Sequence, residues 1–439
     1  MELSQALGII NLTAPEEVQS LSDLLSPDLI RQAFSLTHTV TLRKRKLPLE
    51  SMVWLVIGMA IFNNKPMSHI VNLMDIVDRT GRSFTAPSSV IARRKTLGED
   101  AIRVLFDLTQ QHWHEEARHP LWHGLTLNAV DGVVWHTRDT PENAEAFGKA
   151  SNQHGERGYP QVRMVCLMEL SSHLLRASVS GRYDINEMRL AAQLAENAPD
   201  NSITLFDKGF YSLGLLHDWH NAGENRHWLT PLKKNTQYEV VRKLGRQDEL
   251  IRLKTTPQAR KQWKGLPEEL IVRLIRRKVN GTERQVVTSM TDAMRHPATD
   301  VAELYKHRWE IELGYREAKQ FLLGNRWTLR SRLPDLVKQE LWGMLTYNLV
   351  RYQMIKMAFS LKGNYLPYQL SFSGAVSEIL RLLIGLTWAS PGAIPGHLKH
   401  FYSNAGMLKL PPRREREYVR EVREKRSKYP FKNNAGHLK

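Results

Sequence analysis

The chain has 439 residues, of which 42% are hydrophobic and 24% are charged. This balance is typical of a folded protein with a sizeable core and excludes wholesale disorder, and the length allows two or three domains. The formal net charge of +17 favours a polyanionic partner, and nucleic acid is the commonest one. A basic enzyme without a nucleic-acid role is the alternative that composition alone leaves open.

The single cysteine, Cys166, excludes a disulfide within the chain and a cysteine-based zinc site. It lies in an apolar run and is interpreted as a small core residue. The longest apolar run, Met52–Phe62, is far shorter than the roughly 20 residues that span a bilayer, and no signal peptide is recognised at the start. These features predict a cytoplasmic protein without a membrane partner.

The first part of the chain, residues 1–118, is predicted to be an all-helical DNA-binding domain. The turn signal Asn63–Pro66 separates two of its helices, which could form a helix-turn-helix. Candidate DNA contacts are the run Arg43–Lys46 and the side chains of Arg93, Arg94 and Lys95, with a solvated surface as the alternative for each. The expected helices are Pro15–Leu25, Pro27–Leu36, Leu49–Phe62, Met67–Asp75 and Ser88–Glu116.

Near residue 120 the sequence pattern changes from helical periodicity to short runs rich in Val, Leu and Thr. These runs predict a mixed α/β core. Residues 233–290 contain short, basic β-type runs and are interpreted as a β-rich insertion. Long helices are expected at Asp300–Leu323 and Leu336–Phe359, and the basic end of the chain is interpreted as a tail that orders on DNA. The strands expected in the core are Leu125–Thr137, Val162–Leu170, Leu174–Ser180, Ser202–Phe206 and His227–Leu232, with helices at Ile185–Asn197 and Tyr211–Ala222.

Two aspartates stand out because each follows an apolar strand. Asp131 interrupts an apolar run and precedes a glycine, and Asp207 ends another run with a glycine two residues later. A charge at such a position is costly unless something such as a metal compensates it, and sites lie at the carboxyl ends of strands in α/β sheets. Taken singly, each aspartate could instead cap the next element.

A third carboxylate comes from the predicted helix Asp300–Leu323. At about 100° per residue, one narrow face of that helix carries Tyr305, Arg308, Glu312 and Lys319, whereas Glu310 and Glu317 lie elsewhere. The alternative is a solvated face with an Arg308–Glu312 ion pair four residues apart.

These residues have a coherent chemistry. Carboxylate oxygens suit Mg²⁺, and two ions about 3.5–4 Å apart can activate a nucleophile and stabilise the leaving oxygen of a phosphodiester. The Arg308 fork matches phosphate oxygens, and Tyr305 and Lys319 could contact the DNA backbone. We therefore predict that Asp131, Asp207 and Glu312 form a shared metal site.

The spacing Tyr305-(2)-Arg308-(3)-Glu312-(6)-Lys319 resembles the Y-R-E-K signature of bacterial insertion-sequence transposases, the insertion-sequence-four family. Asp131-Gly132 and the run Asp207–Tyr211 resemble the two aspartate motifs of that family. The resemblance is strong over residues 120–350 and looser before them. It implies a DDE transposase with an RNase H-like catalytic domain at 119–330, followed by a helical region at 331–439.

The resemblance also implies the activity. It implies cut-and-paste transposition: nicking at the element's ends, a hairpin intermediate, its reopening, and strand transfer to target DNA. The implied cofactor is Mg²⁺, with Mn²⁺ possible and two ions per active site. The implied partners are the terminal inverted repeats and target DNA, which a homodimer would bind. The implied location is the cytoplasm, in association with the nucleoid.

One departure concerns the hairpin. Relatives can place a tryptophan in the last insertion strand, where it stacks on a flipped base, but this chain has Arg284 at about that position, with Trp228 and Trp263 elsewhere. Arginine can also stack on bases, so Arg284 is retained, with Lys208, among the candidate DNA contacts. The competing hypotheses are a stand-alone nuclease on the same scaffold and a DNA-binding protein that has lost catalysis.

Overall fold

The computed structural model describes residues 25, 27–39, 47–73, 86–152, 155–279, 282–324, 326–388 and 391–411. Three predictions lie largely or wholly outside these residues: the helix at Pro15–Leu25, the basic run Arg43–Lys46 and the basic tail. Within the part that is described, no helix is long and apolar enough to cross a membrane.

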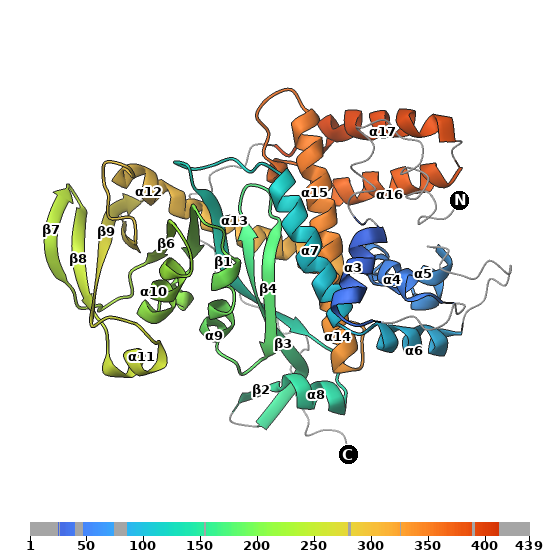
Figure 1. Cartoon of the computed structure of the whole chain (residues 1–439), viewed down its shortest axis with the longest axis horizontal. Coiled ribbons are helices and arrows are strands. Elements are labelled where there is room, and N and C mark those ends of the chain that lie inside the picture. Colours follow the sequence, from blue (N-terminus) through green and yellow to red (C-terminus); the bar gives the residue numbers. More distant parts are fainter. Residues whose placement is uncertain are drawn as a thin grey trace, which may run out of the picture.

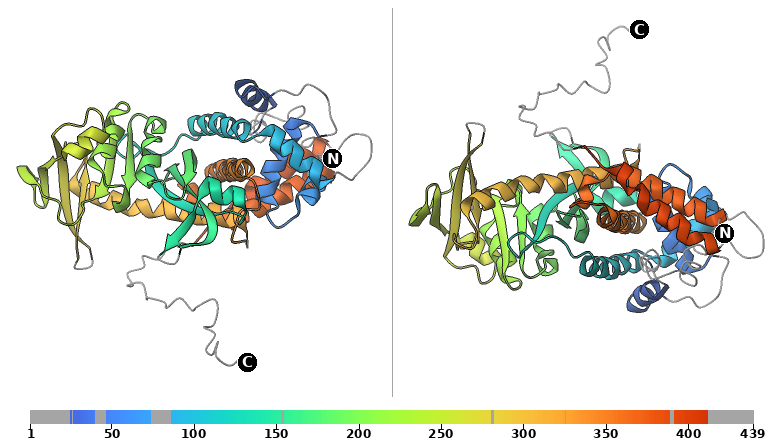
Figure 2. Two further views of the ribbon diagram at one scale, coloured as in Figure 1. Left: turned by 90° about the horizontal axis from the view of Figure 1, so that it is seen from below. Right: turned by 90° about the horizontal axis from the view of Figure 1, so that it is seen from above.

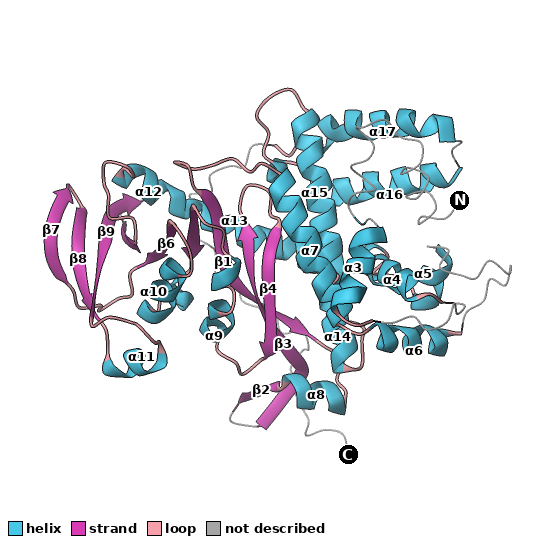
Figure 3. Ribbon diagram, in the orientation of Figure 1, coloured by secondary structure: helices cyan, strands magenta, loops and turns pink. Residues whose placement is uncertain are grey.

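A ten-stranded mixed sheet forms the centre of the fold (Figure 3). Its strands run in the order β2-β3-β1-β5-β6-β10-β9-β8-β7, and β4 pairs with β3. The pairs β1–β3 and β3–β4 are antiparallel, whereas β1–β5 and β5–β6 are parallel. The strands are β1 (Thr126–His136), β2 (Lys149–Asn152), β3 (Gly155–Glu169), β4 (Leu175–Arg182), β5 (Ser202–Phe206), β6 (Arg226–Pro231), β7 (Glu239–Gly245), β8 (Asp248–Lys254), β9 (Glu269–Val279) and β10 (Thr282–Thr288).

The predicted insertion is not a separate sheet. Its strands β7 to β10 continue the central sheet, because β10 pairs antiparallel with β6 at Val286–Thr288. They lie at the end of the molecule farthest from the N-terminal helices (Figure 1). Two short helices that the sequence reading had missed are α8 (Pro141–Phe147), before β2, and α11 (Pro257–Gln262), inside the insertion.

Helices gather at the other end of the molecule, where the first and last parts of the chain lie side by side (Figures 1 and 2). The helix α15 runs past the N-terminal helices, and one apolar cluster joins side chains from Leu25 to Leu408 with one face of the sheet. The helices concerned are α3 (Pro27–Leu36), α4 (Leu49–Ile61), α5 (Met67–Leu73), α6 (Pro87–Leu97), α7 (Asp100–Glu116), α14 (Pro334–Leu341), α15 (Met344–Ser360), α16 (Phe372–Trp388) and α17 (Ile394–Ser403).

The opposite face of the sheet has its own apolar cluster, which includes Val130, Phe206 and Trp219. The helices α9 (Glu187–Ala192) and α10 (Leu213–Asn221) cover this face. The strand β5 is therefore buried on both faces along its whole length, including Ser202 and Thr204.

Three predicted helices are each interrupted. The expected helix Ser88–Glu116 ends at Gly98, whose φ of 73° suits glycine, and α7 begins two residues later. The expected helix Asp300–Leu323 is divided into α12 (Ala298–Leu304), a 3₁₀ turn at Tyr305–Arg308 and α13 (Trp309–Leu323). The third, Leu336–Phe359, breaks at Gly343. Periodicity persists across such breaks, which is why the pattern alone predicted continuous helices.

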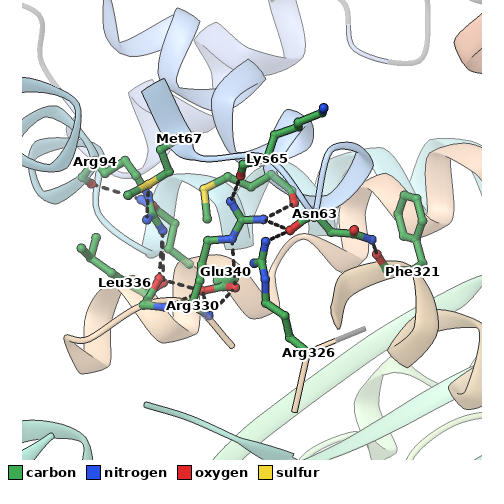
Figure 4. Close-up of polar contacts among 12 residues, drawn as sticks. Asn63, Lys65, Met67, Arg94, Phe321, Arg326, Arg330, Leu336 and Glu340 are labelled. Atoms are coloured by element: carbon green, nitrogen blue, oxygen red, sulfur yellow. Dashed lines mark hydrogen bonds and ion pairs between the residues drawn. The ribbon is translucent and has the colours of Figure 1, made fainter. Parts of the chain in front are cut away.

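A polar network joins the N-terminal helices to the segment between α13 and α14 (Figure 4). Arg94 on α6 is 1% exposed and donates to Gln339 Oε1 at 2.8 Å and to the Leu336 carbonyl at 3.2 Å. The prediction that Arg94 contacts DNA is therefore wrong for this arrangement, because its guanidinium is used inside the protein. The buried, hydrogen-bonded Arg94 instead fixes α6 against α14.

The turn after α4 is used in the same way. Asn63 Nδ2 donates to the Phe321 carbonyl at 2.6 Å, near the end of α13, and the Asn63 carbonyl accepts from Arg326 and, at 2.7 Å, from Arg330 (Figure 4). Arg330 also donates to the Lys65 carbonyl at 3.1 Å. The turn of the predicted helix-turn-helix therefore contacts the segment after α13 through Asn63 and the Lys65 carbonyl, while Asn64, Lys65 and Pro66 remain exposed.

A second buried polar group, Glu169 at the end of β3, supports the core beneath the sheet. Its carboxylate accepts from the Ser171 and Ser172 amides and lies 3.1 Å from His119 Nδ1. Burial acts to raise the pKa of Glu169, but His119 and the hydrogen bonds outweigh it and hold the pKa at about 2. The ionised carboxylate is thus the stable form in the folded protein.

We expect this carboxylate to contribute about 3 kcal/mol above pH 4.5, because its pKa is lower in the folded state than in the unfolded state. That contribution is lost as the pH falls from 4.5 towards 2. Urea unfolding of wild type and Glu169→Gln between pH 7 and pH 3 measures it, with a stability gap that is widest at neutral pH and narrows in acid. A gap that is constant with pH would contradict the ionised assignment.

Candidate active site

The two aspartates lie on neighbouring parallel strands, Asp131 inside β1 and Asp207 directly after β5. The register pairs Val130 of β1 with Phe206 of β5, and Asp131 and Asp207 come next in sequence. The apolar residues before them anchor both strands in the core, while the two carboxylates are only partly buried. The sheet therefore places the two predicted carboxylates beside each other, at the position where α/β folds carry their sites.

Asp131 lies in a partly desolvated, acidic environment. Its Oδ1 accepts from the Gly132 amide at 2.7 Å. Burial raises the pKa of the Asp131 carboxyl to about 6; the charges of Asp207 and Glu312 act in the same direction, and the Gly132 amide and Arg308 oppose them. Mutual repulsion of this kind arises when carboxylates share a small space, and a bound cation would relieve it.

Asp207 also serves the local backbone. Its Oδ1 accepts from the Gly209 amide at 2.7 Å and from the Phe210 amide at 3.2 Å, so it caps the 3₁₀ turn Lys208–Phe210. The capping alternative and the site prediction are therefore both compatible with Asp207, because the cap fixes the orientation of the carboxylate at the end of the strand.

Glu312 lies in the first turn of α13, which packs against β1. Arg308 donates to Glu312 Oε1 at 2.6 Å, and its Nη1 lies 3.8 Å from Asp131 Oδ2. The guanidinium thus bridges the carboxylate of the helix and that of the strand. The Arg308–Glu312 ion pair of the alternative interpretation is present, but its arginine also faces Asp131 and is not on a purely solvated face.

Tyr305 joins the same cluster although the helix is interrupted. In the 3₁₀ turn, side chains three residues apart eclipse one another, so Tyr305 and Arg308 remain on one side. Tyr305 hydrogen-bonds to Arg308 and lies in the field of Asp207 and Arg284, and burial raises its pKa to about 12. Three predicted site residues, Asp131, Tyr305 and Glu312, are therefore gathered around Arg308.

The remaining candidates lie in different places. Lys319 is half-buried with its Nζ 5.7 Å from the centre of the Trp135 ring, and Lys208 and Lys95 are exposed. Arg93 is partly buried and donates to the Leu47 carbonyl at 2.7 Å, so part of its guanidinium is used within the N-terminal region. Among the predicted insertion cations, Arg276 and Arg277 pair with Glu249 and Glu303.

The two competing glutamates of α13 point elsewhere. Glu310 is buried with its Oε2 3.0 Å from His173 Nε2, and Glu317 pairs with the buried Arg351. Both belong to a polar network between the β3–β4 turn and α15. The geometry therefore favours Glu312 over its neighbours as the third carboxylate.

The aromatic candidates for base stacking differ in exposure. Trp228 is 3% exposed, and Trp263 packs over Gly214 on α10, whereas Arg284 is exposed on β10. Trp309, which the sequence reading did not consider, directly follows Arg308 and is 48% exposed. Its exposure could have been predicted from the sequence, because Trp309 lies beside the charged face of the helix and not on its apolar face.

The donor set of Asp131, Asp207 and Glu312 consists only of carboxylate oxygens, which fits Mg²⁺. Among the described residues, no three Asp, Glu, His or Cys side chains lie close enough together to hold a metal ion. The Arg308 guanidinium lies between Asp131 and Glu312. The residues fit the ion chemically, and Asp131, Asp207 and Glu312 are the side chains that would hold it.

Known proteins are similar to this chain over nearly its whole length. Residues 122–349 match the family described as "Transposase DDE domain", and residues 15–107 match "Insertion element 4 transposase N-terminal". The chain is 52% identical over 433 residues to the transposase InsG for insertion sequence element IS4 of Escherichia coli (strain K12), covering 98% of each chain.

Two further similarities are weaker. The InsZ protein of Escherichia coli (strain K12) is 35% identical over 234 residues, which cover 52% of this chain and 77% of that protein. A cryo-EM structure of the piggyBac transposase synaptic complex with hairpin DNA is similar with a TM-score of 0.41 and 10% identity, covering 96% of this chain and 88% of that one.

The match to the DDE domain covers both aspartates and Glu312, and the match to InsG covers nearly the whole chain. The chain therefore belongs to the IS4 family of DDE transposases, enzymes that cleave DNA and transfer its strands.

Proposed function

We propose that Asp131, Asp207 and Glu312 are the catalytic carboxylates of this transposase. The observation that carries the proposal is the bridge made by Arg308, which brings Glu312 of α13 to Asp131 of β1, beside Asp207 of β5. These residues are 76 and 105 positions apart in sequence. Two strand ends and a helix have no structural need to place three acids and one arginine together, which supports a catalytic role.

In this proposal the three carboxylates hold two Mg²⁺ ions, with Mn²⁺ as a substitute. The ions supply activation of a water or a 3′-hydroxyl and stabilise the leaving oxygen. The Arg308 guanidinium, whose fork matches phosphate oxygens, would bind the scissile phosphate or a neighbouring one. Tyr305 lies beside that position and Lys319 lies further along α13, while the exposed Lys208 and Lys95 would contact the DNA backbone.

We further propose a cut-and-paste route through a hairpin. Trp228 is buried, so the exposed Arg284, which lies near Tyr305, is the better candidate to stack on a flipped base. The stacking role that a tryptophan can fill in relatives therefore falls to Arg284 in this chain. A homodimer holding both terminal repeats, associated with the nucleoid in the cytoplasm, is the proposed working assembly.

The strand arrangement supports an RNase H-like assignment for the catalytic region. In the order β4-β3-β1-β5-β6, three antiparallel strands are followed by two parallel ones, with Asp131 inside β1 and Asp207 directly after β5. We propose that this region covers residues 119–330, with the insertion at about 233–290, an N-terminal DNA-binding region at 1–118 and a helical C-terminal region at 331–439.

The experiment is excision from a supercoiled plasmid that carries the inverted repeats flanking the gene. Wild-type protein is incubated with Mg²⁺, with Mn²⁺ and with EDTA, and the excised ends are separated on denaturing gels to reveal covalently closed hairpins. We expect excision with either metal, none with EDTA, and hairpin ends at early times.

The outcomes separate the parts of the proposal. Excision with open ends at all times would overturn the hairpin step and leave the metal-dependent reaction in place. Excision in EDTA would overturn the metal assignment itself. Nicking of plasmids that lack the repeats, at an equal rate, would favour the stand-alone nuclease.

A further inference from the structure

The helix that carries Glu312 packs against the sheet at Gly314. Gly314 of α13 is buried, and a Cβ atom there would lie 2.6 Å from Cε and 2.8 Å from Sδ of Met168 on β3. Glycine at this position therefore leaves room for the end of the Met168 side chain between the helix and the strand. The residue that follows, Tyr315, contacts the strand backbone.

The Tyr315 hydroxyl joins two strands at the candidate site. It donates to the carbonyl oxygen of Asp131 at 2.5 Å and accepts from the amide of Cys166 at 3.1 Å. Asp131 and Cys166 are paired opposite each other in the β1–β3 register. A single buried phenol from α13 is thus fixed to the backbone of Asp131 and to the strand beside it.

The position of this contact relative to Glu312 matters. Tyr315 lies three residues after Glu312, which is less than one turn of the helix. Apolar packing is non-directional and tolerates small slides of a helix over a sheet, whereas two hydrogen bonds to one hydroxyl fix both its height and its direction. The hydroxyl therefore sets where Glu312 stands with respect to Asp131.

We propose that Tyr315 is a positioning residue, whose hydroxyl sets the separation between the catalytic carboxylates of α13 and β1. This inference rests on the proposed function, because it matters for catalysis only if Asp131 and Glu312 act together. Reactions that depend on aligned groups lose about 10²-fold in rate from a misplacement of about 1 Å.

The test compares Tyr315→Phe with a matched control, Tyr347→Phe. Tyr347 on α15 is also a fully buried tyrosine behind α13, and its hydroxyl accepts from Arg351 Nε at 3.1 Å. The Tyr347 hydroxyl would lie 3.4 Å from a Cβ atom on Gly314, so both variants remove a phenol oxygen beside the same helix. Of the two hydroxyls, the one on Tyr315 holds the Asp131 backbone.

Three quantities are measured for each protein. They are the affinity for a duplex of one terminal repeat, the single-turnover nicking rate at saturating protein, and the Mg²⁺ concentration that gives half of the maximal rate. All are measured below the unfolding temperature of the variant, as determined by circular dichroism. Asp131→Asn is run in parallel as the inactive reference.

We expect Tyr315→Phe to bind the repeat within about twofold of wild type, to nick 10- to 100-fold more slowly, and to need more Mg²⁺, in line with a misplacement of about 1 Å or less. We expect Tyr347→Phe to nick within about threefold of wild type, with an unchanged Mg²⁺ requirement. A structural role alone would lower the unfolding temperature of both variants without separating their Mg²⁺ requirements.

Two results would overturn the positioning role: wild-type nicking by Tyr315→Phe, or equal slowing by the two tyrosine variants. In either case an inactive Asp131→Asn would leave the carboxylate assignment standing. Normal nicking by Asp131→Asn would instead show that the proposed function has failed, whatever the tyrosine variants do.

Discussion

Glu312→Gln is expected to lose cleavage by about 10³-fold while binding the terminal repeats as wild type does. The substitution keeps the shape of the side chain but removes the charge that would hold a metal ion, and such an ion supplies several kcal/mol of transition-state stabilisation. Binding survives because the exposed cations that would contact the backbone of the repeat are untouched. Excision of the plasmid-borne element measures the loss, and a gel shift with one repeat measures the binding.

The chain supplies the matched control for this experiment. Glu310 lies two residues earlier on the same helix but faces His173 in a buried pair. We expect Glu310→Gln to lower the free energy of unfolding by about 1–3 kcal/mol, because it weakens a buried hydrogen bond, and to cut within about threefold of wild type. If Glu310→Gln does not cleave DNA and Glu312→Gln does, the third carboxylate is Glu310 and not Glu312.

The proposed carboxylates could be predicted from the sequence because each stands in an unusual local context. Asp131 is a charge inside an apolar strand, Asp207 follows another, and Glu312 lies on a helical face that is neither apolar nor purely solvated. Strand periodicity and helix periodicity are local properties, so the elements carrying these residues were predicted to within a few residues. The spacing of Arg308 and Glu312 even predicted their contact.

The partners of these elements could not be predicted, because partner choice is set by tertiary packing. Arg94 looks like a surface cation in the sequence, yet it is buried against α14. Tyr315 looks like an ordinary core residue, and only the pairing of Asp131 with Cys166 reveals what its hydroxyl holds. The break at Tyr305–Arg308 was also invisible, because a 3₁₀ turn keeps residues three apart on one side.

The docking of the N-terminal helices depends on a single buried carboxylate, Glu340 on α14. It accepts from the Arg330 amide at 2.9 Å and from the Ser331 amide at 3.0 Å, and it faces the guanidinium of Arg330 (Figure 4). Burial lowers the pKa of Arg94 to about 10, and the charge of Glu340 acts in the opposite direction. Glu340 thus lies near the buried Arg94 and the partly buried Arg330, and its charge compensates both.

We therefore expect Glu340→Ala to lower the free energy of unfolding by about 3–5 kcal/mol, because removing one partner leaves buried charges uncompensated. Urea unfolding followed by circular dichroism measures the loss. The control is Arg103→Ala on α7, which breaks exposed pairs with Asp100 and Asp107 and should cost less than about 1 kcal/mol. A Glu340→Ala protein as stable as Arg103→Ala would mean that apolar packing alone holds the N-terminal helices on the catalytic region. The hydrogen bonds of Asn63 with Phe321 and Arg330 would then result from that packing and would not be what holds the helices in place.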